Sequence, residues 1–184
     1  MNMVIIIAGA VVVLFVLWAV SCRRRLVVMD ENINDAMTQI GVQISSRFDV
    51  LTVLLYLTKG YAAHEAQMLI GTIKSRRRAI TATSTPDDVL EQEEIIAETL
   101  DRISVMAERY SDLKANENYA KYMNAVESYE KMVNTSRLIY NDNVTKLNRE
   151  LRMLPASLPA GAFGFRHRDH PEAAEDKADM HGMR

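Results

Sequence analysis

The sequence predicts an all-α protein: a single N-terminal transmembrane helix, an elongated antiparallel bundle of about three long helices, and a disordered C-terminal tail. Three observations predict this class. No side chain from Met1 to Cys22 is charged, and three arginines follow. Before Pro155, glycine and proline are scarce while helix-favouring residues are abundant. Apolar residues recur every three or four positions, without the period-two alternation of strands. The expected boundaries are 1–25 for the anchor with its basic flank, 26–154 for the bundle and 155–184 for the tail.

The first element is an apolar run from Val4 to Val20. About 20 apolar residues form a helix roughly 30 Å long, which matches the hydrocarbon core of a bilayer. A single helix also pairs its own backbone groups, as lipid requires. Trp18 lies near the end that meets the arginines, where its ring suits the headgroup layer. The residues expected to anchor the chain are Val4, Ile5, Ile6, Ile7, Val11, Val12, Val13, Leu14, Phe15, Val16, Leu17 and Trp18.

Three interpretations of this run compete. A cleaved secretory signal carries its positive residues before the apolar run, whereas here they follow it. A lipoprotein signal would acylate Cys22, but Ala19 stands where a leucine is expected three residues earlier. A retained anchor fits the pattern best. The lone cysteine cannot build an internal disulfide framework, which agrees with a reducing compartment.

Arg23, Arg24 and Arg25 set the expected orientation, because positively charged flanks stay on the cytoplasmic side. We therefore expect the N-terminus outside and the bundle in the cytoplasm, on the cell membrane or an internal membrane. The same arginines are expected to bind anionic lipid headgroups, which contributes about 1 kcal/mol per residue near the surface.

The first soluble segment, from about 26 to 79, has one apolar stripe and no proline. We expect it to be one helix, and since no proline interrupts it, it can be continuous with the membrane helix. Arg76, Arg77 and Arg78 close it, either complementing the helix dipole or forming a patch for a partner.

Thr85 and Pro86 start the second helix, as its N-cap and first residue, and this helix is expected to end near Tyr110. Its acidic side is typical of a solvated face. After a connection at 111–116, the third helix runs from Glu117 to Leu154, and Pro155 ends it. Its apolar residues repeat close to a heptad.

Catalytic motifs are missing. His64 and Glu65 begin the pattern H-E-x-x-H, but Met68 stands where the second histidine is needed. The remaining histidines lie in the expected tail, and neither a P-loop nor G-x-G-x-x-G occurs. We therefore expect no catalytic residue, no metal and no cofactor. The net charge of −2 argues against nucleic-acid binding.

Several motifs together resemble the LemA family of bacterial membrane-anchored proteins. Arg47–Leu51 and Lys59–Glu65 resemble R-x-D-L and K-G-Y-x-x-H-E, and Glu108–Asn116 resembles E-x-Y-P-D-L-K-A-N. The pattern E…R-x-x-Y-N-D-x-V…N…P is similar to the series Glu130, Arg137, Tyr140–Val144, Asn148 and Pro155. The sequence departs from the family where Thr52 and Val53 replace its P-N, where Ser111 replaces its proline, and where the aromatic ending of its tail is lost.

The resemblance implies an elongated antiparallel bundle on one N-terminal membrane helix, without known catalytic activity. A related branch, the MamQ-type proteins, is associated with magnetosome membranes, which implies a role in membrane organisation. The shared polar residues either form buried pairs that set helix register or make a protomer contact or ligand site. These residues are Arg47, Asp49, His64, Glu65, Glu130, Arg137, Tyr140, Asn141 and Asn148.

Two functions follow as expectations. The first is a non-enzymatic scaffold that self-associates and organises or remodels the membrane. The second is an adaptor or regulator that presents the bundle to a membrane protein such as a protease or sensor. Because the second helix is too short to cover all of the first, we expect an uncovered contact between copies at Ile33, Met37, Ile40 and Ile44.

Overall fold

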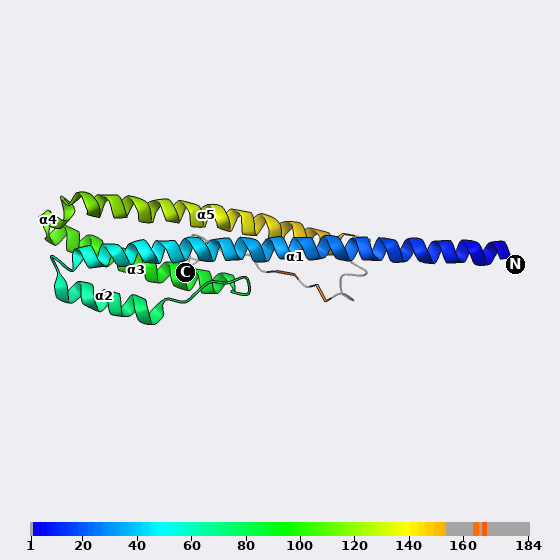
Figure 1. Ribbon diagram of the computed structural model, residues 1–184, viewed down its shortest axis with the longest axis horizontal. Coiled ribbons are helices and arrows are strands. Elements are labelled where there is room, and N and C mark those ends of the chain that lie inside the picture. The colour runs from blue at the N-terminus through cyan, green and yellow to red at the C-terminus, as the bar shows by residue number, and fades with distance from the viewer. Residues whose placement is uncertain (1, 154–163, 166, 169–184) are drawn as a thin grey trace, which may run out of the picture. The chain divides into compact units, whose positions relative to one another are not determined.

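The computed structural model describes residues 2–153, 164–165 and 167–168, and within these it contains helices but no strand. The prediction of an all-α fold is therefore confirmed. The helices are α1 (Asn2–Thr58), α2 (Ala63–Arg76), α3 (Pro86–Arg109), α4 (Ser111–Lys114) and α5 (Glu117–Arg152) (Figure 1). Contacts divide the chain into two compact units. The first unit combines 1–34 with 141–170, and the described part of the second is 35–140.

The second unit is an antiparallel bundle of four main helical segments, from α1, α2, α3 and α5, with the short α4 between α3 and α5. Figure 1 shows α2 running back along the C-terminal part of α1, α3 returning, and α5 reversing direction once more. Each segment contributes one apolar stripe, because only one face of each helix can point inward. The largest fully buried side chains of this unit are Met37, Ile40, Ile44, Phe48, Leu51, Leu54, Leu55, Ile95, Ile96 and Ile103.

The expected single helix from 26 to 79 is wrong, because the chain reverses between α1 and α2. Amide groups of Tyr61 and Ala62 both donate to the Thr58 carbonyl, and Gly60 weakens the helix at the same point. The physical reason lies in α2, whose buried residues are Ala66, Leu69, Ile70 and Ile73. A straight continuation of α1 would leave this stripe uncovered, so the helix folds back.

The start of α3 is as predicted. The Thr85 side chain accepts a hydrogen bond from the Asp88 amide, and the Asp88 carboxylate accepts one from the Thr85 amide. Pro86 follows the N-cap directly. This capping box satisfies two backbone donors that would otherwise have no partner. It also holds down the pKa of Asp88, through hydrogen bonds from Thr85.

The segment between α2 and α3 lies close against α1. A side chain at Gly41 would fall against the Ile80 carbonyl oxygen and reach within 3.1 Å of Ile80 Cβ. Glycine is therefore required at this close approach. The amide of Arg78 donates to Gln92 Oε1 (2.7 Å), and Gln92 is fully buried. The segment is thus fixed at both α1 and α3.

The third predicted helix is confirmed as α5, which ends at Arg152 close to the expected boundary. The preceding connection contains the short helix α4, whose Leu113 is buried. Along α5, buried residues follow the predicted stripe at Val126, Val133, Ser136, Tyr140, Val144 and Leu147.

In the first unit, the α1 segment 2–34 and the α5 segment 141–152 are antiparallel. The Asn143 side chain donates to the Asn32 carbonyl (3.2 Å), and about two turns farther along both helices Arg25 pairs with Glu150 (3.1 Å). Leu26, Ile33, Val144 and Leu147 are buried. Toward the N-terminus, α1 continues beyond this packing as a helix that carries no charged side chain before Arg23.

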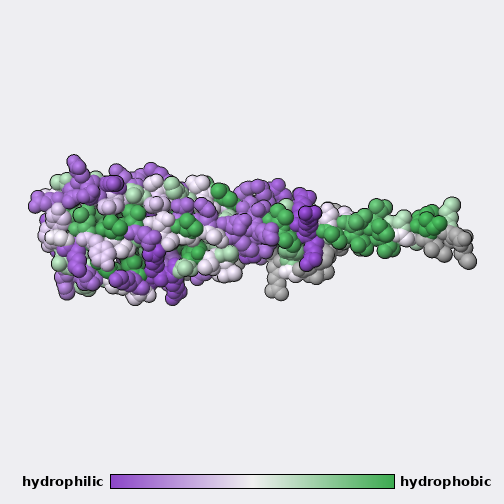
Figure 2. All heavy atoms as spheres, in the orientation of Figure 1, coloured by the Kyte–Doolittle hydropathy of each residue, from purple (hydrophilic) through white to green (hydrophobic). Residues whose placement is uncertain are grey.

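That N-terminal part of α1 is long and apolar enough to cross a membrane, and its apolar window is not buried in the structure. Figure 2 shows it as an apolar stretch. Exposed fractions are 69% for Ile6, 66% for Leu14 and 63% for Phe15. An aqueous solvent would leave this surface uncovered, so α1 is compatible with a membrane anchor.

Candidate functional site

Four charged side chains form a layer inside the second unit, which we call the charged layer: Arg47, Glu93, Glu130 and Arg137. Arg47 Nη2 donates to Glu130 Oε2 (2.7 Å), and Arg137 Nη1 donates to Glu93 Oε2 (2.9 Å). Arg47 is only 6% exposed. The Arg137–Glu93 side chains are 17% and 18% exposed. The layer therefore joins α1, α3 and α5; Arg47, Glu93 and Arg137 are mostly withdrawn from water, whereas the Glu130 side chain is 50% exposed.

Burial and pairing act in opposite directions in this layer. Burial raises the pKa of Glu93, while Arg137 and Arg47 partly offset that rise. Burial also lowers the pKa of Arg47, against the attraction of Glu130 and Glu93. Arg47 Nε has no hydrogen-bond partner among the described residues. Pairing of this kind can set which turn of one helix faces which turn of the next, so the prediction that these motif residues set helix register stays a prediction.

Replacing Arg137 by alanine should destabilise the bundle in a pH-dependent way. The Glu93 carboxylate would keep only Arg47 as a compensating charge, and removing one partner of a mostly buried pair costs on the order of 2–3 kcal/mol near neutral pH. Urea unfolding of the full chain in detergent micelles, followed by circular dichroism, measures the loss. Lys131→Ala is the matched control, because its pair with Glu127 is exposed, and we expect little change.

The sign of the pH dependence follows from Glu93. Its pKa is raised in the folded state, so between that value and the ordinary glutamate value of about 4.3 the folded chain binds more protons than the unfolded chain. Acidification through this window therefore favours folding, and more so in the Arg137→Ala variant. The stability difference between variant and wild type should shrink as the pH falls. A difference that is constant with pH would mean that Glu93 is not the group left uncompensated.

A second contact holds Arg77 against α1. Its guanidinium donates to Asp49 Oδ1 (2.7 Å) and to Ser45 Oγ (2.7 Å), and it lies 5.4 Å from the centroid of the Phe48 ring. Asp49, a carboxylate of the family motif, is therefore the ion-pair partner of Arg77, the middle arginine of the triplet 76–78. The Arg77–Phe48 geometry is that of a cation–π contact.

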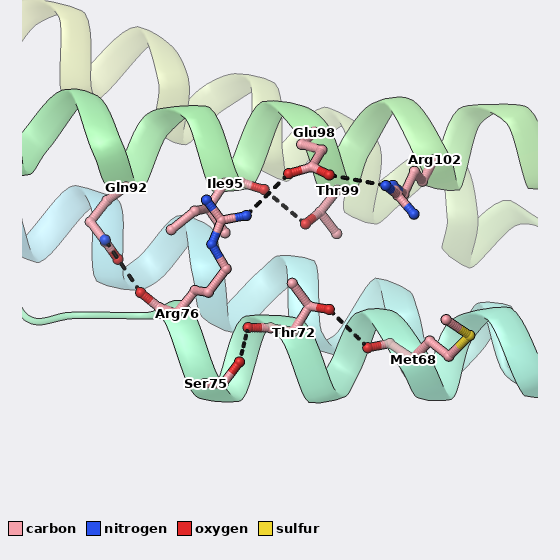
Figure 3. A network of polar contacts seen from close by, with 9 residues as sticks. All are labelled: Met68, Thr72, Ser75, Arg76, Gln92, Ile95, Glu98, Thr99 and Arg102. Atoms are coloured by element: carbon pink, nitrogen blue, oxygen red, sulfur yellow. Dashed lines mark hydrogen bonds and ion pairs between the residues drawn. The ribbon is translucent and has the colours of Figure 1, made fainter.

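The polar residues between α2 and α3 form a chain of contacts, shown in Figure 3. Arg76 Nη1 donates to Glu98 Oε2 (3.2 Å), and Glu98 also pairs with Arg102 (3.0 Å). Gln92 Nε2 donates a hydrogen bond to the Arg76 carbonyl oxygen (3.4 Å). Because α2 ends here, this carbonyl has no partner within its own helix, and Gln92 supplies one.

Two family motifs, Lys59–Glu65 and Glu108–Asn116, lie at reversals of the chain and meet at one end of the second unit. Asn116 Nδ2 donates to the Tyr61 hydroxyl (3.3 Å), and Arg109 lies 3.8 Å from Glu65. His64 is exposed beside them. These contacts join the α1–α2 reversal to the α4–α5 connection, so they serve chain reversal.

The remaining motif residues lie farther along α5. Tyr140 and Asn141 are buried and half-buried, and Asn141 Oδ1 has no hydrogen-bond partner among the described residues. In the first unit, Asn148 accepts from the Arg168 amide (3.1 Å) and donates to its carbonyl (2.9 Å). Arg168 also pairs with Asp30 (2.8 Å). Most of the expected tail, 155–184, lies outside the described residues, but Arg168 is attached to both helices.

The expected contact between copies needs correction. Ile33, Met37, Ile40 and Ile44 are at most 2% exposed within a single chain. The folding back of α2 gives the second unit one helical segment more than expected, and Met37, Ile40 and Ile44 lie in the core of that unit, while Ile33 is buried within the first unit. These four side chains are therefore core residues, and they offer no free surface to a neighbour.

Sequence reasoning missed Glu93 and Gln92. Glu93 appeared to belong to a solvated acidic face, because its neighbours Glu91 and Glu94 are charged as well. The only available signal was position: Gln92, Ile95, Ile96 and Thr99 recur at helical intervals and are all buried. Among the described residues, no group of three histidine, cysteine or acidic side chains is placed to hold a metal ion.

The fold and these contacts define a class: an all-α bundle with an apolar core and partly buried ion pairs between its helices, whose first helix includes a membrane-length apolar segment. The model of the LemA family matches residues 36–181, and the chain belongs to the LemA family. The match begins after the apolar segment. No similar sequence was found among curated proteins.

Proposed function

We propose that this protein is a non-enzymatic, membrane-anchored helical scaffold that self-associates and organises or remodels the membrane. One observation carries the proposal: α1 is a single helix from Asn2 to Thr58, so its exposed apolar part and its bundle part share one backbone. The arginines after the apolar run favour an N-terminus outside and a cytoplasmic bundle.

The proposed contact between copies lies on the outward side of α5. Met132, Leu138 and Ile139 are 46%, 71% and 52% exposed, while Val133, Ser136 and Tyr140 point into the core. Anchoring every copy in one plane raises their local concentration, so that weak side-to-side contacts add up. A second copy of the same chain is the occupant that this arrangement favours.

The double variant Leu138→Glu and Ile139→Glu should convert large assemblies into small ones while the bundle stays folded. Exposed apolar residues can be made charged without disturbing the core, so circular dichroism should not change. Light scattering and electron microscopy of the detergent-extracted full chain measure the assembly. A wild type that is a folded monomer at every concentration would contradict the scaffold.

The adaptor remains the second candidate, because a different exposed surface favours it. A cavity of about 290 Å³ lies between α2 and α3, lined by Met68, Leu69, Val105 and Met106 with Glu65, Arg102 and Arg109 around them. Met68 and Val105 are 60% and 50% exposed. The double variant Met68→Glu and Val105→Glu is therefore the matched control for the α5 variant, and it should leave assembly intact. If a membrane protein copurifies with the wild type and is lost in this control alone, that result would favour the adaptor.

A further inference from the structure

A groove in the first unit begins where the apolar run ends. It has a volume of about 490 Å³ and is lined by Ser21, Arg24, Arg25, Val28, Met29 and Asn32 of α1, with Asn143 and Lys146 of α5. The α1 residues are spaced by three, one, three, one and three, so they form one face of the helix. We call this cavity the boundary groove.

The lining of the boundary groove combines cationic, apolar and neutral polar side chains. Arg24, Arg25 and Lys146 are exposed, and no carboxylate is among the lining residues. Two carboxylates stand next to it: Glu150 pairs with Arg25 (3.1 Å), and Asp142 pairs with Lys146 (2.6 Å). Arg24 has no ion pair in the part of the chain that the structure describes. Ser21 and Asn143 add neutral hydrogen-bonding groups.

We propose that the boundary groove binds the phosphate of one anionic phospholipid, with Arg24 and Lys146 as its principal cations. A guanidinium and an ammonium both suit phosphate oxygens. Val28 and Met29 add apolar side chains to the lining, and these suit the glycerol and first acyl carbons of a lipid better than a free anion. The inference rests on the proposed membrane anchoring, because only an inserted α1 brings Ser21 to the headgroup layer.

The site differs from general attraction between arginines and an anionic surface. General attraction depends on depth, so every cation near the bilayer contributes to it. In the groove, by contrast, only those cations whose side chains line it are expected to contribute. Arg23 adjoins Arg24 but does not line the groove, and Arg152 lies six residues beyond Lys146, toward the anchor end of the antiparallel pair. Both are exposed, so they are controls of equal charge at equal or smaller distance from the bilayer.

Native mass spectrometry of the full chain in a mild detergent tests the proposal, with phosphatidylglycerol and phosphatidylcholine as probes. We expect the wild type to retain phosphatidylglycerol in preference to phosphatidylcholine. Arg24→Gln and Lys146→Gln should each weaken this retention about fivefold. Arg23→Gln and Arg152→Gln should leave it nearly unchanged. Glycerol 3-phosphate in solution should not displace the lipid at similar concentrations.

Three results would overturn the groove. Equal losses in all four variants would show general surface attraction, no preference for the anionic lipid would show no headgroup site, and displacement by glycerol 3-phosphate would show a plain anion site. Circular dichroism of each variant confirms folding, which substitutions at exposed side chains should preserve. Flotation with liposomes separates the two hypotheses: a chain that does not float contradicts the anchor itself, whereas a chain that floats without lipid preference contradicts only the groove.

Discussion

Introducing arginines at Val11 and Leu14 should release the protein from the membrane. Each arginine near the centre of a membrane helix costs about 3 kcal/mol, and the lost apolar side chains add roughly 0.5 kcal/mol each. This total cost of about 7 kcal/mol is expected to exceed the favourable free energy of membrane insertion that the remaining apolar residues contribute. The variant should therefore appear in the soluble or aggregated fraction after alkaline carbonate extraction, whereas the wild type stays with the bilayer.

Val42→Arg is the control for this change. Val42 lies in the same helix and is 52% exposed, but it belongs to the bundle, so membrane retention should be normal. Retention of the Val11, Leu14 double variant would contradict anchoring by α1. A separate measurement reports orientation: when protease is added outside intact cells that carry the wild-type chain, the proposed topology requires residues beyond Arg25 to stay uncut.

Phe48→Ala should produce the largest loss of folding stability among single substitutions considered. Phe48 is fully buried in the second unit, and the Arg77 guanidinium lies over its ring. Removing a buried phenylalanine costs about 3–5 kcal/mol, from lost burial and from the cavity left behind. Arg77 would also lose the surface that holds it beside Asp49. Because domains are stable by only about 5–15 kcal/mol, the urea midpoint should fall steeply.

Val53→Ala serves as the comparison for Phe48, since it also shortens an apolar side chain on α1 but is 42% exposed. We expect its effect to stay within about 0.5 kcal/mol. Similar losses in the two variants would mean that the packing of α1 in the bundle differs from the one described. Both measurements use the full chain in detergent, with urea unfolding followed by circular dichroism.

The sequence alone was sufficient for helix class and for those boundaries that local chemistry decides. Thr85 and Pro86 mark the start of α3, because capping depends on residues only three positions apart. The reversal after Thr58 was missed because nothing local forces it: Gly60 is permissive, and the decisive factor is burial of the α2 stripe against distant helices. Tertiary packing decided that boundary.

The same distinction applies to the candidate sites. The place of Arg23, Arg24 and Arg25 at the end of the apolar segment was predictable, since within one helix the order in sequence gives the order along the axis. The partners Glu93 and Lys146 could not be predicted, because each belongs to a different helix from the residues that it meets. Glu93, for example, is 44 residues away from Arg137 in the sequence. A periodic pattern says that a residue lies on a stripe, but it does not say which residue of another stripe lies opposite.

The hold of Gln92 on the segment after α2 has a consequence for how the chain opens. The Arg78 amide is bonded to a side chain buried in α3, so its hydrogen should exchange with solvent only when α2 and α3 separate. The same bonds restrain the backbone beside Arg76, Arg77 and Arg78, three adjacent bonds that trypsin would otherwise cut readily. A segment without regular secondary structure thus reports cooperative opening of the bundle, as a helix interior would.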